Sequence, residues 1–206
     1  MTNRHPHLIL ASQSPRRRQL LTENGFEFIV DPPDESIEKM VQTERGICSK
    51  CSPEELVLES ALVKAKAIAN QHPTGLVLAA DTVAECQAEI LGKPVDRDHA
   101  ERMLRLMSGQ RHRVLTGVCL WHRPSDVYAL HLEQTILKMD PLTELQLEEI
   151  LDSDGWVGKA GAFGYQDGLD WLSIEAGLES TVVGLPVERL PNWIKELNDQ
   201  AGQQDA

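Results

Sequence analysis

Three arginines at the start of an expected helix point to an anion-binding site near the amino terminus. The apolar stretch Leu8–Ala11 is followed by Ser12, Ser14 and Pro15, and then by the arginines of 16–18. Proline is tolerated in the first helical turn because its missing N–H would have no partner there, and Ser14 is placed to cap that turn. Arginines oppose the helix dipole at this end unless an anion joins them. The pattern therefore favours a phosphate site over an ordinary basic turn.

Three other segments carry side chains suited to an anionic substrate. The strand expected over Leu76–Ala80 ends at Asp81. Carboxylates at that end of a strand are often functional in open α/β sheets, although a turn or capping aspartate is about as common. Lys93 stands between a glycine and a proline, which excludes a P-loop and leaves either a ligand or a solvated lysine. The glycine-rich segment 158–168 allows close backbone approach to a ligand, and its Gln166 could bond a base, but a tight loop explains it equally well.

Composition limits the classes of partner. The 206 residues are 41% hydrophobic, which suits one sizeable α/β domain or two small ones. The net charge of −12 argues against binding nucleic acid or an anionic membrane, but it permits a small anionic substrate where positive charge is concentrated. We expect a cytoplasmic protein because no secretory signal or membrane-length apolar run is visible and the four cysteines are scattered. Cys48 and Cys51 form a C-x-x-C, but no second ligand pair at zinc spacing follows.

Helical and strand patterns alternate along the chain, with a hairpin in the middle. We expect residues 1–198 to form one domain and residues 199–206 a polar C-terminal tail. Helices are expected over 15–23, 52–70, 98–109, 142–151 and 186–197, with Asp98 as the cap of the third. Strands are expected over 7–11, 26–30, 76–80, 114–121 and 128–137, and a long loop over 31–51. This order favours a mixed sheet flanked by helices.

Together these stretches resemble the Maf family of nucleoside triphosphate pyrophosphatases, from Leu8 to about Leu190. The matching motifs are Leu10–Arg17, Asp34–Glu35, Ala61–Ala65, Ala80–Val83, Leu91–Pro94, Met107–His112, Thr116–Val118, Gly158–Gly161 and Val182–Pro186. The resemblance implies a Maf/ITPase-like α/β fold, with a mixed central sheet flanked by helices and a cleft between two lobes. It also implies a cytoplasmic homodimer that hydrolyses nucleoside triphosphates to the monophosphate and pyrophosphate with Mg²⁺ or Mn²⁺.

The resemblance assigns chemical roles to five residues. Asp81 is similar to the family's proton acceptor for the attacking water. Arg17, Lys64 and Lys93 are similar to its phosphate ligands, and Glu35 with Asp81 would hold the metal ion. An aspartate is a poor base for free water, so the assignment needs the metal to be chemically sensible.

The resemblance also implies which residues bind the rest of the substrate. The expected substrate-binding set is Ser12, Ser14, Arg16, Lys64, Thr82, Lys159 and Gln166. Among these, Arg16, Thr82 and Gln166 match the branch that prefers dTTP and UTP, whereas the 7-methyl-GTP branch has a tryptophan in place of Arg16. The chain departs from the common pattern around Gln166, and its segment 39–53 is longer than usual.

Three alternative functions remain open at this point. A non-catalytic, nucleotide-binding regulator of cell division would need the anion site but neither a base nor a metal, and Asp81 and Glu35 argue against it. Another metal-dependent phosphohydrolase would release orthophosphate rather than pyrophosphate. A zinc-stabilised interaction domain around Cys48 and Cys51 lacks a second ligand pair.

Overall fold

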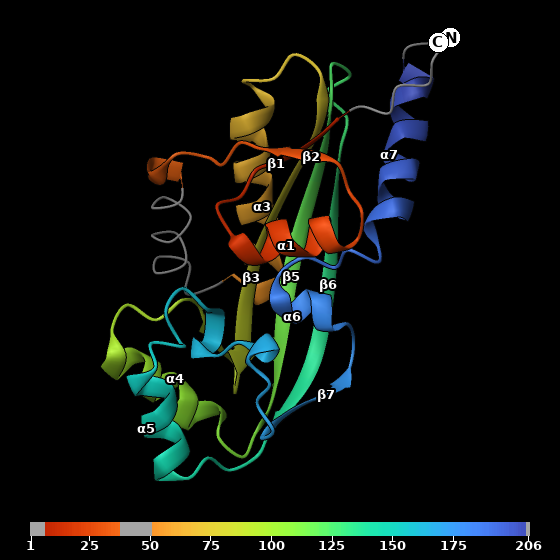
Figure 1. The fold of residues 1–206 in the computed structure, drawn as a ribbon. Helices are drawn as coiled ribbons and strands as arrows, with labels where there is room; N and C mark the ends of the chain where they lie inside the picture. Colours follow the sequence, from red (N-terminus) through yellow and green to blue (C-terminus); the bar gives the residue numbers. More distant parts are fainter. Residues whose placement is uncertain (1–6, 38–50, 205–206) are drawn as a thin grey trace. The chain divides into compact units, whose positions relative to one another are not determined.

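A seven-stranded mixed sheet is the framework of the computed structural model, which describes residues 7–37 and 51–204 (Figure 1). The strand order is β2-β1-β3-β5-β6-β7, and β4 pairs with β3. β1 is parallel to β2 and β3, whereas β4 and β7 run antiparallel to their partners. Helices flank this sheet, so the expected mixed α/β fold is confirmed.

The elements are bounded as follows. The strands are β1 (Leu8–Leu10), β2 (Phe28–Val30), β3 (Gly75–Cys86), β4 (Glu89–Leu91), β5 (Arg111–Arg123), β6 (Tyr128–Met139) and β7 (Leu172–Ala176). The helices are α1 (Pro15–Glu23), α3 (Pro53–Ala69), α4 (Arg97–Met107), α5 (Glu144–Asp152), α6 (Glu179–Val183) and α7 (Leu190–Gln204), with the short 3₁₀ turns η1 (Ala160–Ala162) and η2 (Tyr165–Asp167). Among the described residues, no helix has the length and hydropathy that a membrane span requires.

The chain divides into two compact units. Unit 1 comprises Met1–Asp81, Gly117–Leu132 and Gly184–Ala206, and unit 2 comprises Thr82–Thr116 and Glu133–Val183. The boundary at Asp81 and Thr82 falls inside β3, so this strand contributes to both units. The single domain over residues 1–198 and the cleft between two lobes stay predictions.

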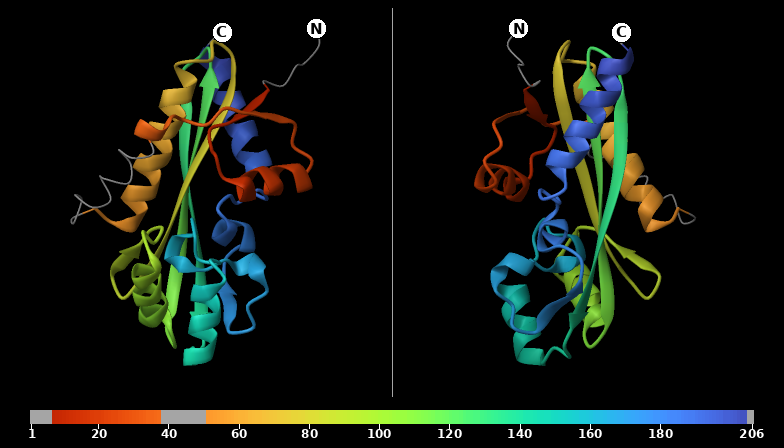
Figure 2. Two further views of the ribbon diagram at one scale, coloured as in Figure 1. Left: turned by 60° about the vertical axis from the view of Figure 1, so that its left-hand side comes forward. Right: turned by 90° about the vertical axis from the view of Figure 1, so that its right-hand side faces the viewer.

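Unit 1 has a sheet that is covered on both faces. Figure 2 shows α3 on one side of its strands and α1 with α7 on the other. Leu10 and Leu78 pack in the core that includes Leu21 of α1 and Leu197 of α7. Their neighbours in the strands, such as Ile9, Val77 and Ala79, pack instead in the core that includes Ala61 and Ala65 of α3. Because successive side chains of a strand point to opposite faces, strands covered on both sides read as continuous apolar runs.

The two helix starts that bear on the site are confirmed. α1 begins at Pro15, and the Ser14 Oγ accepts from the Arg17 N–H at 3.4 Å. α3 begins at Pro53 with a complete capping box, in which the Glu55 N–H donates to Ser52 Oγ at 3.1 Å and the Ser52 N–H donates to Glu55 Oε2 at 2.9 Å. These signals are local, which is why the sequence shows them clearly.

The expected end of a strand at Ala80 was wrong. β3 continues through Asp81 to Cys86, so Asp81 lies inside a strand rather than after one. The extension pairs antiparallel with β4, with Ala84 opposite Leu91 and Cys86 opposite Glu89. The expected cap of α4 was wrong as well: Asp96, not Asp98, accepts from the His99 N–H at 2.7 Å. The first error comes from β4, a partner that the local pattern of β3 does not show, whereas the second is a choice between two aspartates two positions apart.

The carboxyl-terminal segment also differs from expectation. The helix expected over 186–197 begins only at Leu190, as α7, and Pro191 lies in its first turn, where proline is tolerated. A separate short helix, α6, precedes it at Glu179–Val183 and was not expected. α7 continues through residues 199–204, so this part of the expected polar tail is helical. Leu197 and Ala201 are both buried and one turn apart, so the amphipathic face of α7 continues past residue 198.

The expected loop over 31–51 is described only at its ends. Residues 35–37 are helical, and Asp34 accepts from the backbone N–H groups of Ser36 at 2.8 Å and Ile37 at 3.2 Å. The hydrogen bond from the Ser36 hydroxyl, together with these two, holds the pKa of Asp34 below its ordinary value. Cys51 is disulfide-bonded, whereas Cys48 and residues 38–50 as a whole lie outside the described residues.

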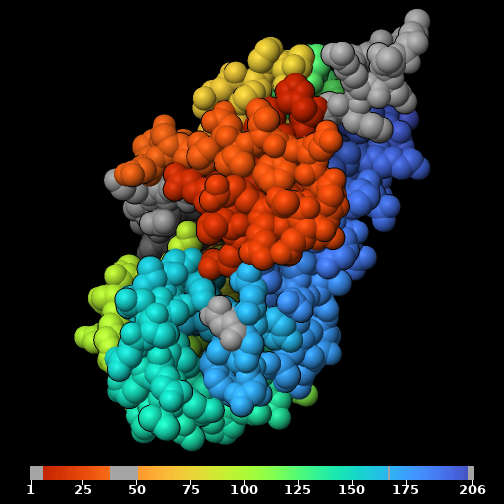
Figure 3. Space-filling view, viewed as in Figure 1, coloured from red at the N-terminus to blue at the C-terminus, as the bar shows by residue number. Residues whose placement is uncertain are grey.

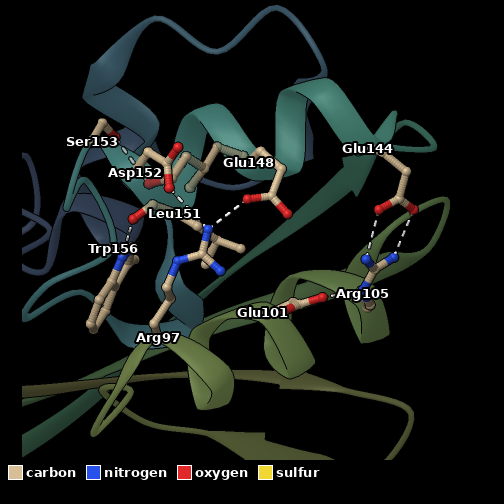
Figure 4. A network of polar contacts seen from close by, with 10 residues as sticks. Arg97, Glu101, Arg105, Glu144, Glu148, Leu151, Asp152, Ser153 and Trp156 are labelled. Atoms are coloured by element: carbon tan, nitrogen blue, oxygen red, sulfur yellow. Dashed lines mark hydrogen bonds and ion pairs between the residues drawn. The ribbon is translucent and has the colours of Figure 1, made fainter.

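In unit 2, ion pairs join α4 to α5 over a shared apolar core. Arg105 donates to both carboxylate oxygens of Glu144, at 2.9 and 2.7 Å, and Arg97 bonds Glu148 and Asp152 (Figure 4). Exposed pairs are individually weak, but a network of several fixes the geometry of the elements that it joins. The position of α5 matters because this helix forms one wall of a cavity in unit 2.

Candidate functional site

Ser12, Ser14 and Arg17 form one cluster at the amino-terminal end of α1. The Arg17 guanidinium donates from Nη1 to Ser12 Oγ at 3.1 Å and from Nε to the Gly184 carbonyl at 2.8 Å. The Ser14 N–H donates to the same Ser12 oxygen at 3.2 Å. Arg16 follows Pro15 in the first helical turn and is half-buried. The structure therefore brings the predicted basic turn and its two serines together in unit 1.

This cluster belongs to a segment on the molecular surface. In Figure 3 the stretch that contains α1, coloured red to orange, forms a broad part of the visible surface of unit 1. Ser12 itself is only 3% exposed, and its Oγ accepts from two donors, so it fixes the turn and the arginine. A guanidinium held at a helix amino terminus is an arrangement that suits phosphate oxygens.

Lys64 and Asp81 form a buried ion pair in unit 1. Lys64 Nζ lies 3.0 Å from Asp81 Oδ1, and the two side chains are 5% and 6% exposed. Asp81 shares a strand face with Val77 and Ala79, which pack against α3, so strand alternation brings it to the lysine of that helix. An ammonium at this distance favours the ionised carboxylate. The pair thus offers a base and a cation in one place.

The expected metal ligands have suitable chemistry but do not form a protein cage. Glu35 is exposed and is the first of the helical residues 35–37, and Asp81 is buried. Within the described part of the chain, no three or more His, Cys, Asp or Glu side chains cluster closely enough to hold a metal ion. Mg²⁺ is commonly bound by one or two carboxylates together with substrate phosphates, so two carboxylates fit that mode. The metal assignment of Glu35 and Asp81 stays a prediction.

Thr82 is part of a short chain of hydrogen bonds in unit 2. Its Oγ1 lies 2.9 Å from Thr116 Oγ1, and the Thr116 hydroxyl donates to the Thr181 carbonyl at 2.8 Å. Thr116 and Thr181 are fully buried, whereas Thr82 is half-buried. The sequence placed Thr116 in a motif but gave it no role, because its partner in α6 is 65 residues further along the chain.

The turn that carries Lys93 is joined to the glycine-rich loop of unit 2. The Gly161 N–H donates to the Gly92 carbonyl at 3.0 Å, next to the exposed Lys93. Gly161 has a φ of +70°, and a Cβ there would meet the Phe163 ring at 3.0 Å and Ala84 at 3.1 Å, so this position needs glycine. Sequence reasoning treated the lysine turn and the loop as separate weak signals, and the structure brings them together.

The same loop lines a cavity of about 380 Å³ in unit 2. Its walls come from α5 and from the loop, with Phe163 and Trp171 as the aromatic members and Lys159 as the basic one. Gln166 is exposed in η2 and is not among the residues that line the cavity. The loop lies on the surface in Figure 3, where it is cyan to light blue. Lys159 and Gln166 therefore belong to the same loop, but only Lys159 lines the cavity.

His112, which the sequence singled out only as part of a motif, is buried without hydrogen bonds. Its ring packs edge-on against Phe163, with 5.4 Å between the ring centroids, and neither ring nitrogen has a hydrogen-bond partner among the described residues. Burial lowers the pKa of His112 to about 4, and the Gln110 backbone opposes this effect only in part. His112 is therefore neutral at pH 7 and contributes an apolar contact to Phe163.

Replacing His112 with Phe is expected to flatten the pH dependence of stability between pH 6.5 and about 4. In this pH window His112 is protonated in the unfolded chain but stays neutral in the folded protein. Wild-type stability therefore falls as the pH falls, by about 1.4 kcal/mol per pH unit for one proton. Urea unfolding at pH 7 and pH 5 measures the slope in both proteins. Equal slopes of unfolding free energy against pH would show that His112 is not the group responsible. Above pH 7, the unfolding free energies of the two proteins should differ by a constant amount.

The expected site residues are distributed over both units. Ser12, Ser14, Arg16, Arg17, Glu35, Lys64 and Asp81 belong to unit 1, and Thr82, Lys93, Lys159 and Gln166 belong to unit 2. Within unit 1 the structure forms the serine–arginine cluster and the Lys64–Asp81 pair, and within unit 2 it joins the lysine turn to the glycine-rich loop. The catalytic and binding roles of these residues stay predictions.

Comparison with known proteins identifies the relatives of this chain. A dTTP/UTP pyrophosphatase of Rhodopirellula baltica is 52% identical over 195 residues, which cover 94% of this chain and 83% of that protein. Proteins of the same name from Salinibacter ruber and Symbiobacterium thermophilum are 41% and 40% identical, covering 89% and 88% of this chain and 87% and 89% of their own lengths. The solved structure of the Staphylococcus aureus Ham1 protein matches with a TM-score of 0.42 and 14% identity over 65% of this chain and 71% of that one, a similarity too low to bear on function. The Maf family model, described as Maf-like protein, matches residues 7–197, and the chain belongs to that family.

Proposed function

We propose that this protein hydrolyses nucleoside triphosphates to the nucleoside monophosphate and pyrophosphate, with a preference for dTTP and UTP. Its family membership and the names of its relatives support this reaction. The observation that carries the proposal is the buried contact between Lys64 and Asp81. The family motifs suggest Lys64 as a phosphate ligand and Asp81 as a base. The two residues are 17 positions apart in the sequence and are joined by a hydrogen bond from Lys64 to Asp81.

In this proposal Asp81 accepts the proton of the attacking water. The water oxygen bonds to the α-phosphorus, the bond from that phosphorus to the bridging oxygen breaks, and pyrophosphate leaves with the electron pair. A bound Mg²⁺ or Mn²⁺ ion would make water more acidic and would neutralise phosphate charge. Asp81 and Glu35 are the residues that we propose as its protein ligands. Lys64 keeps the Asp81 carboxylate ionised and oriented.

Cationic side chains supply the attraction for the phosphates. A triphosphate brings about four negative charges to a protein whose net charge is −12, so positive charge must be concentrated where it binds. Arg17 is fixed by Ser12 and Gly184, which pre-orients its guanidinium for phosphate oxygens. We propose that Lys64 and Lys93 are the other phosphate ligands.

The remaining residues are proposed to bind the nucleoside. Arg16, Thr82 and Gln166 support the preference for dTTP and UTP, because a tryptophan replaces the arginine in the 7-methyl-GTP branch. Lys159 is proposed as a further substrate contact from the wall of the unit 2 cavity. None of these roles requires nucleic acid or a membrane as partner.

A panel of nucleoside triphosphates tests the proposed function. The purified protein is incubated with dTTP, UTP, CTP, GTP and ATP, with Mg²⁺, with Mn²⁺ and with a chelator, and pyrophosphate and orthophosphate are measured separately. Pyrophosphate from dTTP and UTP that disappears with the chelator is the expected result. Orthophosphate would indicate a different phosphohydrolase, and tight binding without any product would indicate a non-catalytic regulator.

We also propose that the protein acts in the cytoplasm, where nucleoside triphosphates are made and used, and that it forms a homodimer. The homodimer is supported by an apolar stripe on β6, where Tyr128, Leu130 and Leu132 are 46%, 38% and 38% exposed. β7 pairs with β6 only from Ile136 onward, so the part of β6 under this stripe has an open edge among the described strands. Such an edge can pair with a second copy about a twofold axis.

Changing Leu130 to Glu is expected to convert the dimer to a 23.0 kDa monomer. A charge on the apolar stripe would be buried without a partner in the dimer but solvated in the monomer. Light scattering after size-exclusion chromatography measures the mass. Leu145→Glu is the matched control, because Leu145 is 70% exposed on α5, an element that does not carry the stripe. A dimer that survives Leu130→Glu would place its interface elsewhere.

A further inference from the structure

The hydroxyl groups of Thr82 and Thr116 are connected in a fixed order of donors and acceptors. Thr116 Oγ1 lies 2.8 Å from the carbonyl oxygen of Thr181 and 2.9 Å from Thr82 Oγ1. A carbonyl oxygen only accepts, so the single proton of the Thr116 hydroxyl points to Thr181. The proton between the two hydroxyls must then come from Thr82. Thr82 consequently has no proton left to donate, and its remaining lone pairs can only accept.

Burial keeps this order from reversing. Thr116 and Thr181 are both 0% exposed, so water cannot replace the hydrogen bond to the Thr181 carbonyl. If Thr116 turned its proton toward Thr82, that buried carbonyl would lose this donor, which is costly. Two buried residues, Thr116 in β5 and Thr181 in α6, therefore determine whether the half-buried Thr82 hydroxyl donates or accepts.

We infer that Thr116 is a positioning residue that makes Thr82 an obligate hydrogen-bond acceptor and so selects a base with a ring N–H. This inference rests on the proposed function, and it deepens that proposal by giving a reason for the base preference. It excludes phosphate oxygens as partners of the Thr82 hydroxyl, because they too only accept at this contact.

The chemistry of the pyrimidines matches an obligate acceptor. Uracil and thymine carry a proton on N3, whereas N3 of cytosine is an unprotonated acceptor. An acceptor-only hydroxyl facing N3 forms a hydrogen bond with the first two bases and places two lone pairs against each other with the third. Sites that bond a substrate N–H or O–H discriminate strongly because the wrong substrate leaves polar groups unpaired.

The experiment compares UTP with CTP in variants that change only this hydroxyl chain. In Thr116→Val the Thr82 proton is released and can be donated to N3 of cytosine, so the ratio of kcat/KM for UTP over CTP should fall about 10-fold. Thr116→Ser keeps the hydroxyl and should keep the wild-type ratio. Thr135→Val is the matched control: Thr135 is also fully buried, and its hydroxyl bonds the Leu178 backbone at 2.7 and 3.0 Å without contacting Thr82. It should lose stability but keep the ratio.

A wild-type measurement tests the same inference without any variant. With 3-deaza-UTP, in which C–H replaces the N3–H, kcat/KM of the wild type should fall about 10-fold relative to UTP. Binding of the α,β-methylene analogues of UTP and CTP gives the ratio independently of turnover.

The possible outcomes separate this inference from the proposed function. If Thr116→Val keeps the wild-type ratio while Thr82→Val changes it, Thr82 contacts the base but Thr116 does not set its polarity, and the inference is wrong. If neither variant changes the ratio while pyrophosphate is still released, Thr82 does not read the base, and the inference is again wrong although the reaction stands. If the wild type releases no pyrophosphate from any triphosphate and its analogues bind without preference, both fail.

Discussion

Asparagine at position 81 is expected to slow pyrophosphate release at least 100-fold while the protein stays folded. The amide has the size of the carboxylate, and its oxygen can still accept from Lys64, which lies 3.0 Å from Oδ1 in the wild type. It has no lone pair basic enough to take a proton from water, and general-base catalysis contributes about 10²- to 10⁴-fold. The rate loss therefore measures the basic function of Asp81 rather than its packing.

Steady-state kinetics with dTTP and saturating Mg²⁺ measures the effect of Asp81→Asn. Asp152→Asn is a suitable control, because Asp152 also pairs with an arginine but is exposed, at the end of α5 (Figure 4). That variant should keep its wild-type kcat. Turnover of Asp81→Asn within a few-fold of the wild type would remove Asp81 from the mechanism. A thermal melt of the same sample must accompany the assay, since the change removes the negative charge that faces Lys64.

The parts of the site that local sequence controls were predicted from the sequence. The turn from Ser12 to Arg17 is one example, because a strand end, a capping serine and a first-turn proline determine it within six residues. The start of α3 at Pro53 is another, since the capping box needs only Ser52 and Glu55. Both features depend on contacts between residues at most five positions apart.

The parts that depend on distant contacts were not predicted from the residues alone. The course of β3 beyond Asp81 depends on pairing with β4, a strand too short to show a pattern of its own. The contact of Asp81 with Lys64 depends on how α3 packs on the sheet, and only the resemblance to a family pointed to Lys64. The hydrogen bond from Thr116 to Thr181 joins β5 to a five-residue helix that no periodicity indicates. Contacts between residues that are far apart in the sequence can be identified only when the packing of the helices and strands is known.

Changing Lys64 to Met is expected to destabilise the protein more than any of the other substitutions. Methionine keeps the length of the side chain but removes the ammonium, so the Asp81 carboxylate, 6% exposed, loses its charged partner. Breaking a buried pair from one side costs about 3–5 kcal/mol, because the remaining charge stays desolvated. Activity should fall together with stability, since the orientation of the base and a proposed phosphate ligand are lost at once.

Chemical denaturation measures the free energy of unfolding of Lys64→Met. A control variant in the same helix separates the effect of the lost ion pair from the effect of changing any lysine of α3. Lys66→Met is the matched control, because Lys66 lies in the same helix but is exposed, and surface substitutions change stability by only about 0.5 kcal/mol. The double variant Lys64→Met/Asp81→Leu should recover a large part of the lost stability, because it also removes the buried carboxylate that the lysine no longer faces. A protein that tolerates Lys64→Met as well as Lys66→Met would show that the carboxylate finds water or another donor when the lysine is gone. In that case the Asp81 carboxylate would not need Lys64 to stay charged, and the proposed phosphate contact would be the remaining role of this lysine.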